Sequence, residues 1–257
     1  MELEMSVMGR WAFYGIAALM AVSSFIFLMI SVTKPSLLDT YTDYSVAILS
    51  FLPVVTGIYL VTRYGSSSIF GKCFAYLTSG SALWFLGELL WPVYTRILKV
   101  EMPFPSLLDL FWMTGYIFMG LGTYTILKRF NPTYALKRRT ILSISLLTAA
   151  LSVITFTLAS KIYKAPLIDL IIYNYYLIAD IVILGLLTMI YSIFRGGKIS
   201  KAWLILVTGI TTTFLADIFF NLATSTDSET YLLFSDLIYM NGYSLIALGF
   251  TTHAIEF

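Results

Sequence analysis

The chain has 257 residues, of which 59% are hydrophobic and 12% charged, and its mean hydropathy is +0.86. Soluble domains contain about 45–50% apolar and about 25% charged residues, so this composition excludes an ordinary soluble domain and indicates a membrane protein. The net charge of +2 points to no nucleic-acid partner, and the single cysteine, Cys73, excludes an intramolecular disulfide and a cysteine-based metal site.

A membrane-spanning helix needs about 20 mainly apolar residues. Eight segments meet this requirement, and we expect helices at residues 11–32, 44–63, 71–97, 104–127, 140–160, 166–194, 200–223 and 231–254. The first segment lacks a small-residue cleavage pattern, so we interpret it as a retained helix. The predicted fold class is all-α, a polytopic integral membrane protein with about eight transmembrane helices. Seven spans, with one segment merged or lying at the interface, is the alternative.

The basic residues indicate the orientation of these helices. With eight spans, 11 of the 16 basic residues fall on the side of both termini: Arg10, Arg63, Lys72, Lys128, Arg129, Lys137, Arg138, Arg139, Arg195, Lys198 and Lys201. Lys34, Arg96, Lys99, Lys161 and Lys164 fall on the other side. The positive-inside rule therefore predicts that both termini are cytoplasmic.

The second half of the chain repeats a pattern of the first half. Residues 109–116 read DLFWMTGY, and residues 236–243, 127 positions later, read DLIYMNGY. Upstream, LGE ends at Glu88 and LAD ends at Asp217, 129 positions later. We therefore expect two four-helix membrane repeats, residues 1–130 and 131–257. An even number of helices per repeat makes the copies parallel, with their symmetry axis along the membrane normal.

Four carboxylates of the repeats are expected at similar depth in the outer half of the membrane: Glu88, Asp109, Asp217 and Asp236. A charged side chain at the centre of a spanning helix costs about 2.5–3.5 kcal/mol, so such residues usually face the protein interior and mark a site. The helical cores contain no Lys or Arg. Either some of these acids are protonated, or they bind a cation or water. Alternatively, Asp109 and Asp236 cap helix starts, and Glu88 and Asp217 join neighbouring helices.

Aromatic residues accompany these acids in both copies. We expect Trp84, Trp112, Tyr116, Tyr239 and Tyr243 to line the same pocket, because carboxylates beside aromatic faces suit a small cationic ligand. Core packing is the competing explanation. Trp91 is interpreted as a residue of the interfacial aromatic belt. Asp180 has no acidic counterpart, since position 53 is proline, and we include it as an asymmetric site residue.

Catalytic motifs are missing from the sequence. His253 is the only histidine, so neither a Ser–His nor a Cys–His pair can form, and no glycine-rich phosphate loop is present. We predict a non-enzymatic protein without a cofactor, and we leave open a metal and carboxylate-only intramembrane catalysis.

Residues 103–116, PFPSLLDLFWMTGY, contain a Pro-x-Pro-Ser-x-x-Asp segment. This segment resembles a motif in the N-terminal multi-helix membrane domains of some prokaryotic diguanylate cyclases and histidine kinases. The resemblance implies a membrane sensory domain. No kinase or cyclase domain follows before Phe257, so we expect a stand-alone form, a subunit with a cytoplasmic signalling partner, or a piece of a longer protein.

The expected function is a sensory or ligand-binding protein of the prokaryotic plasma membrane. Its outward-facing acidic–aromatic pocket would signal through the cytoplasmic helix ends or a partner. The alternative is a small secondary transporter or a cation or proton channel that uses the same carboxylates. The bilayer is the surrounding partner, and the sequence leaves the oligomeric state open.

Overall fold

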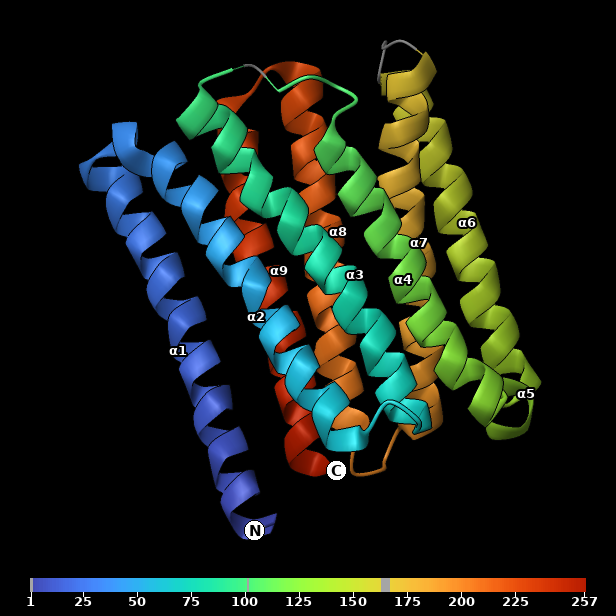
Figure 1. Ribbon diagram of the computed structural model, residues 1–257. Coiled ribbons are helices and arrows are strands. Elements are labelled where there is room, and N and C mark those ends of the chain that lie inside the picture. The colour runs from blue at the N-terminus through green and yellow to red at the C-terminus, as the bar shows by residue number, and fades with distance from the viewer. Residues whose placement is uncertain (1, 101, 163–166) are drawn as a thin grey trace.

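The computed structural model describes residues 2–100, 102–162 and 167–257, and every regular element in these ranges is helical (Figure 1). The long helices are α1 (Glu2–Thr33), α2 (Leu38–Tyr64), α3 (Ile69–Pro92), α4 (Leu107–Phe130), α6 (Arg138–Ile162), α7 (Leu167–Phe194), α8 (Ser200–Thr226) and α9 (Glu229–Glu256). Three short elements connect or extend them: η1 (Pro35–Leu37), the π-helix η2 (Val93–Leu98) and α5 (Pro132–Ala135). The prediction of an all-α chain is confirmed.

Seven helices of the described residues are long and apolar enough to cross a membrane. α6, with 25 residues, is a further long helix. The described part of the chain thus contains seven to eight helices suited to a bilayer, at the positions expected from the sequence. Lys164 and the start of the segment predicted at 166–194 lie outside the described residues.

The long helices alternate in direction, and both termini lie at the same end of the bundle (Figure 1). Short capped turns produce this alternation. Gly65 ends α2 with a positive φ of 72°, and Ser68 caps α3 by accepting a hydrogen bond from the Gly71 amide at 2.9 Å. At the opposite end, Asp227 ends α8 in the left-handed region, and Ser228 caps α9. Capped turns of this length force neighbouring helices to run antiparallel.

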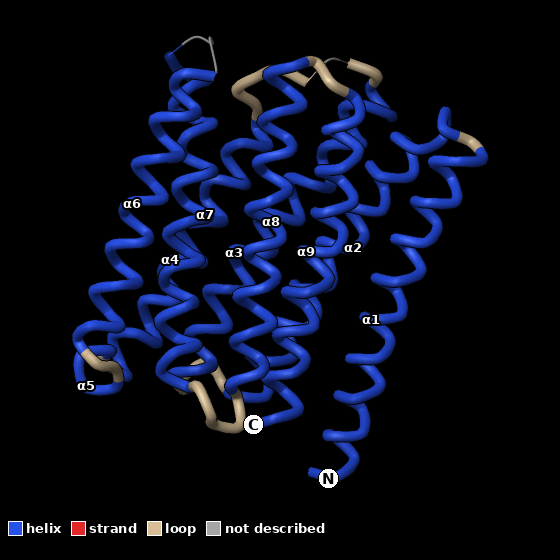
Figure 2. Tube along the Cα trace, turned by 180° about the vertical axis from the view of Figure 1, so that it is seen from behind, coloured by secondary structure: helices blue, strands red, loops and turns tan. Residues whose placement is uncertain are grey.

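The helices pack in a defined order. α3 packs against α4 and α2, while α8 packs against α9 and α7. α2 also contacts α9, and α4 contacts α7, so these four helices join the two halves of the chain. α1, which packs mainly on α9, and α6, which packs on α7, lie at opposite edges, as both views show (Figures 1 and 2).

Glycines allow the tightest approaches between helices. A Cβ on Gly115 of α4 would overlap the Trp84 side chain of α3, and a Cβ on Gly242 of α9 would lie 2.7 Å from Thr213 Cγ2 of α8. Trp84 and Thr213 are 129 positions apart, like Glu88 and Asp217. The same correspondence relates two further contacts, Gly122 with Leu77 and Gly249 with Leu206. The α3–α4 and α8–α9 pairs therefore pack in the same register through small residues, as membrane helices commonly do.

At the end of the bundle that carries the termini, the core is aromatic. His253 of α9 is fully buried, its ring meets the rings of Phe74 and Trp203, and its Nδ1 lies 2.6 Å from the Tyr64 hydroxyl. These contacts fix the end of α9 against α2, α3 and α8.

Candidate functional site

A cavity of about 100 Å³ lies at the end of the bundle opposite the termini. Residues of α2, α3, α4, α7, α8, α9 and the loop before α4 line it. The lining residues are Asp43, Val46, Trp84, Glu88, Trp91, Met102, Phe104, Ser106, Asp109, Trp112, Tyr116, Tyr173, Tyr176, Thr213, Asp217, Phe220, Asn221, Asp236, Tyr239 and Tyr243. A single water needs only about 10–15 Å³, so the cavity admits several waters or one small organic molecule.

The structure brings nine of the ten candidate residues from the sequence to this cavity: Glu88, Asp109, Asp217, Asp236, Trp84, Trp112, Tyr116, Tyr239 and Tyr243. The tenth, Asp180, is fully buried behind Tyr116, whose hydroxyl donates to Asp180 Oδ1 at 2.8 Å. Helical spacing explains this convergence. Asp109, Trp112 and Tyr116 follow an i, i+3, i+7 pattern, which places them on one face of α4. Asp236, Tyr239 and Tyr243 repeat that pattern on α9.

Asp109 caps α4. Its Oδ2 accepts hydrogen bonds from the amide and the hydroxyl of Ser106 at 2.6 and 2.8 Å, and the Ser106 hydroxyl accepts from the Asp109 amide at 3.4 Å. Its Oδ1 accepts from the Tyr176 hydroxyl at 2.7 Å. Both oxygens are therefore occupied by the fold itself, and a capping box satisfies the first turn of the helix.

The cap interpretation of Asp236 is wrong. α9 begins at Glu229, two turns before Asp236, and Ser228 serves as its N-cap. The difference from Asp109 has a local cause. Pro103 and Pro105 precede α4, and the residue before a proline is driven out of the helical region, so α4 starts at Leu107. Asp236 instead lies inside its helix, near the Thr42 hydroxyl of α2.

Glu88 accepts a hydrogen bond from a tyrosine of the opposite half of the chain, and Asp217 lies close to a second such tyrosine. Glu88 Oε1 accepts from the Tyr243 hydroxyl at 2.7 Å, while the Tyr116 hydroxyl lies 3.3 Å from Asp217 Oδ2. Tyr116 and Tyr243 occupy matching positions of the repeated motif. Asp217 Oδ1 also accepts from Tyr239 at 2.7 Å. The two acids thus line one cavity from opposite halves of the chain, each beside a tyrosine of the other half.

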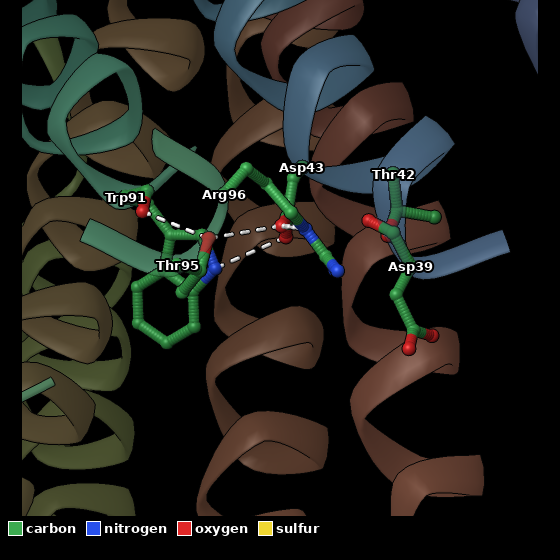
Figure 3. A network of polar contacts seen from close by, with 6 residues as sticks. All are labelled: Asp39, Thr42, Asp43, Trp91, Thr95 and Arg96. Atoms are coloured by element: carbon green, nitrogen blue, oxygen red, sulfur yellow. Dashed lines mark hydrogen bonds and ion pairs between the residues drawn. The ribbon is translucent and has the colours of Figure 1, made fainter. Parts of the chain in front are cut away.

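Asp43 is an acidic lining residue that the sequence analysis missed. It accepts hydrogen bonds from Trp91 Nε1 and the Thr95 hydroxyl, both at 3.1 Å, and pairs with Arg96 Nε (Figure 3). Trp91 therefore binds Asp43 and lines the cavity instead of serving only in an interfacial belt. The helix expected at 44–63 leaves Asp43 outside the span, so the sequence pattern does not bring Asp43 and Arg96 together.

Further lining residues come from α7 and α8. Tyr173 and Tyr176 extend the aromatic wall, and Asn221 is a buried amide, 2% exposed. A signal for the α8 residues was present in the sequence, because Thr213, Asp217 and Asn221 are spaced by four and so share one helix face. Tyr173 and Tyr176 also carried a signal, because with Asp180 they follow an i, i+3, i+7 pattern, although their helix has no partner motif in the first half.

The five lining carboxylates differ in how fully the protein satisfies them. Asp43 and Asp109 each accept three hydrogen bonds, and one of those to Asp43 comes from the Arg96 guanidinium. Among the described residues, neither Glu88 nor Asp217 faces a lysine or arginine, and Asp236 lies within reach only of Arg96, which already pairs with Asp43. Trp112 lies beside Glu88, and its buried indole N–H makes no hydrogen bond of good geometry. The carboxylates that remain free to bind a ligand therefore belong to α3, α8 and α9.

Within the described residues, no group of three or more His, Cys, Asp or Glu side chains is placed to hold a metal ion. The aromatic walls instead suit a polyatomic cation, which is attracted both to carboxylates and to ring faces. Comparisons with known protein families, curated proteins and solved structures find no match to this chain.

Proposed function

We propose that the chain is a multi-pass protein of the prokaryotic plasma membrane that binds a small organic cation in this acidic–aromatic cavity. The main support is that Glu88, Asp217 and Asp236 line one cavity whose walls are tryptophans and tyrosines. Both termini would be cytoplasmic, so the cavity would lie toward the outside. As the resemblance of residues 103–116 suggests, the protein would act as a sensor without catalysis.

The packing supports an internal repeat of residues 1–130 and 131–257. Exchanging the halves converts the α3–α4 contact into α8–α9, the α2–α3 contact into α7–α8, and α2–α9 into α7–α4. The Glu88–Tyr243 and Asp217–Tyr116 contacts exchange in the same way. The pairing of α1 with α9 has no counterpart of similar extent, because α6 packs on α7. We infer a pseudo-two-fold arrangement with the cavity at its axis.

The geometry of α9 supports a sensory role. Asp236, Tyr239 and Tyr243 of this helix line the cavity, and His253, near the far end of the same helix, is held by Tyr64. A ligand that shifts α9 at the cavity would therefore also change the packing of this helix at the end with the termini. A cytoplasmic partner would respond to that change.

Transport is the second candidate function. Parallel repeats with a binding site at their interface are an arrangement of secondary transporters, and the cross-half bonds of Glu88 and Asp217 fit it. Flux of radiolabelled tetramethylammonium into proteoliposomes separates the two functions. A sensor binds the cation without accumulating it, whereas a transporter accumulates it under an imposed ion gradient.

Thermal unfolding of the purified chain in detergent tests the binding proposal. Tetramethylammonium should raise the unfolding temperature, because a ligand that binds only the native state stabilises it. tert-Butanol, with the same number of non-hydrogen atoms and no charge, should not. Glu88→Gln should weaken the apparent affinity at least about tenfold, since it removes a charge from the site. Glu229→Gln, an exposed acid at the start of α9, is the matched control.

The proposal fails if tetramethylammonium, methylammonium and guanidinium all leave the unfolding temperature of the unmodified protein unchanged between pH 5 and pH 9. It also fails if Glu88→Gln and Glu229→Gln respond equally.

A further inference from the structure

A pair of carboxyl groups lies at the α7 side of the cavity. The Asp180 side chain of α7 contacts the Asp217 side chain of α8. One hydroxyl connects both, because Tyr116 lies 2.8 Å from Asp180 Oδ1 and 3.3 Å from Asp217 Oδ2. Asp180 is 0% exposed, and its second oxygen, Oδ2, receives no hydrogen bond from any donor in the described part of the chain.

Counting protons shows what this pair lacks. The single hydroxyl proton of Tyr116 is used on Asp180, and that of Tyr239 is used on Asp217 Oδ1 at 2.7 Å. If both carboxyls were ionised, Asp180 Oδ2 would be a buried acceptor without a donor, and two like charges would be in contact. Each of these situations is unfavourable. One proton held between the two carboxyls removes both.

We infer that Asp180 and Asp217 share one proton while the cavity is empty, and that a cation binding beside Asp217 displaces it. This inference rests on the proposed cation site and adds its coupled ion. The cation enters and the shared proton leaves to the aqueous phase through the cavity, past the rim residues Met102, Phe104 and Ser106. The net charge within the bundle stays the same, so the exchange avoids the cost of adding a charge to a membrane interior.

The titratable groups around the pair are compatible with this exchange. α4 contributes Tyr116, α9 contributes Tyr239 and Tyr243, and α3 contributes Glu88, which is bound to Tyr243. α6 also packs on α7, but its charged residues lie only at its two ends. The described neighbours therefore offer no lysine, arginine or histidine to take the place of the shared proton.

Infrared difference spectroscopy on the full chain in detergent tests the shared proton without any ligand. The unmodified protein at neutral pH should show the carbonyl band of a protonated carboxylic acid that Asp180→Asn lacks. Asp169→Asn, on the same helix and away from the pair, should retain the band. If Asp180→Asn does not fold, Tyr116→Phe keeps both acids and should shift the band by removing its hydrogen-bond donor. Identical carbonyl spectra in the unmodified protein and the folded variant would overturn the shared proton.

Titration with tetramethylammonium in weakly buffered solution, read with a pH-indicator dye, tests the exchange. About one proton should be released per bound cation, and the affinity should rise with pH by up to about tenfold per unit. Asp180→Asn should bind the cation without releasing a proton and with a flatter pH dependence. Binding without proton release in the unmodified protein would overturn the exchange and leave the cation site intact. No binding at any pH would overturn the exchange and the proposed function together, whereas the infrared result would still decide the shared proton.

Discussion

At the scale of single residues, the acids of the cavity separate into two kinds. Asp109 and Asp43 are tied to the ends of their helices, the first by a capping box with Ser106 and the second by Arg96, Trp91 and Thr95. These bonds, together with the one from Tyr176 to Asp109, occupy both oxygens of each acid and would form whether or not a ligand is present. Glu88 instead accepts from Tyr243 and Asp217 accepts from Tyr239, with Tyr116 3.3 Å away, so both acids keep free acceptor positions toward the cavity.

This separation predicts opposite effects of two substitutions. Asp109→Ala should lower the free energy of unfolding by about 1–3 kcal/mol, because it removes the cap and leaves the Tyr176 hydroxyl without its acceptor. The folded fraction should still be stabilised by tetramethylammonium. Glu88→Gln should show the reverse, with a small change in stability and a lost response. Thermal unfolding with and without the cation measures both. An Asp109→Ala protein that folds normally but ignores the cation would contradict the assignment of Asp109 as a structural acid.

At the scale of helices, hydrophobic length predicted the elements well because a spanning segment must satisfy all its backbone groups internally. The i, i+3, i+7 spacing explains why Asp109 and Asp236 reach one cavity together with their aromatic neighbours. Only the alternative of Asp236 as a helix cap is wrong, because where a helix begins depends on the chain before it. The sequence pattern did not pair Arg96 with Asp43, because the helix expected at 44–63 leaves Asp43 outside the span, whereas α2 begins at Leu38.

The helix pairs make a prediction about glycine. Gly115→Ala and Gly242→Ala should each destabilise the protein by about 1–3 kcal/mol, because the added Cβ meets Trp84 in one case and Thr213 in the other. Gly15→Ala is the matched control, since nothing lies within 4 Å of a Cβ there. It should be neutral or stabilising by up to about 1 kcal/mol, because alanine favours a helix. Equal unfolding temperatures for all three variants would show that α3–α4 and α8–α9 do not pack closely through these glycines.

At the scale of the whole molecule, the two halves meet at both ends of the bundle but with different chemistry. The cavity end gathers carboxylates and tyrosines, and the end with the termini gathers Phe74, Trp203 and the buried His253. The repeat in the sequence predicted the first gathering, because it duplicates the acids. The second was not predicted, although Phe74 and Trp203 are 129 positions apart and so occupy matching places of the repeat, because His253 was considered only as a missing catalytic partner.

The arrangement of the termini allows the orientation in the membrane to be tested directly. The excess of basic residues at the end with the termini predicts that this end is cytoplasmic and that the cavity faces outward. In a Cys73→Ser background, which removes the single buried thiol, Lys99→Cys in the loop beside the cavity should react with a membrane-impermeant maleimide added to intact cells. Phe257→Cys, at the opposite end, should react only after permeabilisation. Both positions are exposed in the structure, so burial does not protect either thiol.

Labelling of Phe257→Cys from outside intact cells, with Lys99→Cys protected, would show that the molecule has the opposite orientation, with the cavity toward the cytoplasm. Labelling of both from outside would mean that an odd number of helices crosses the bilayer.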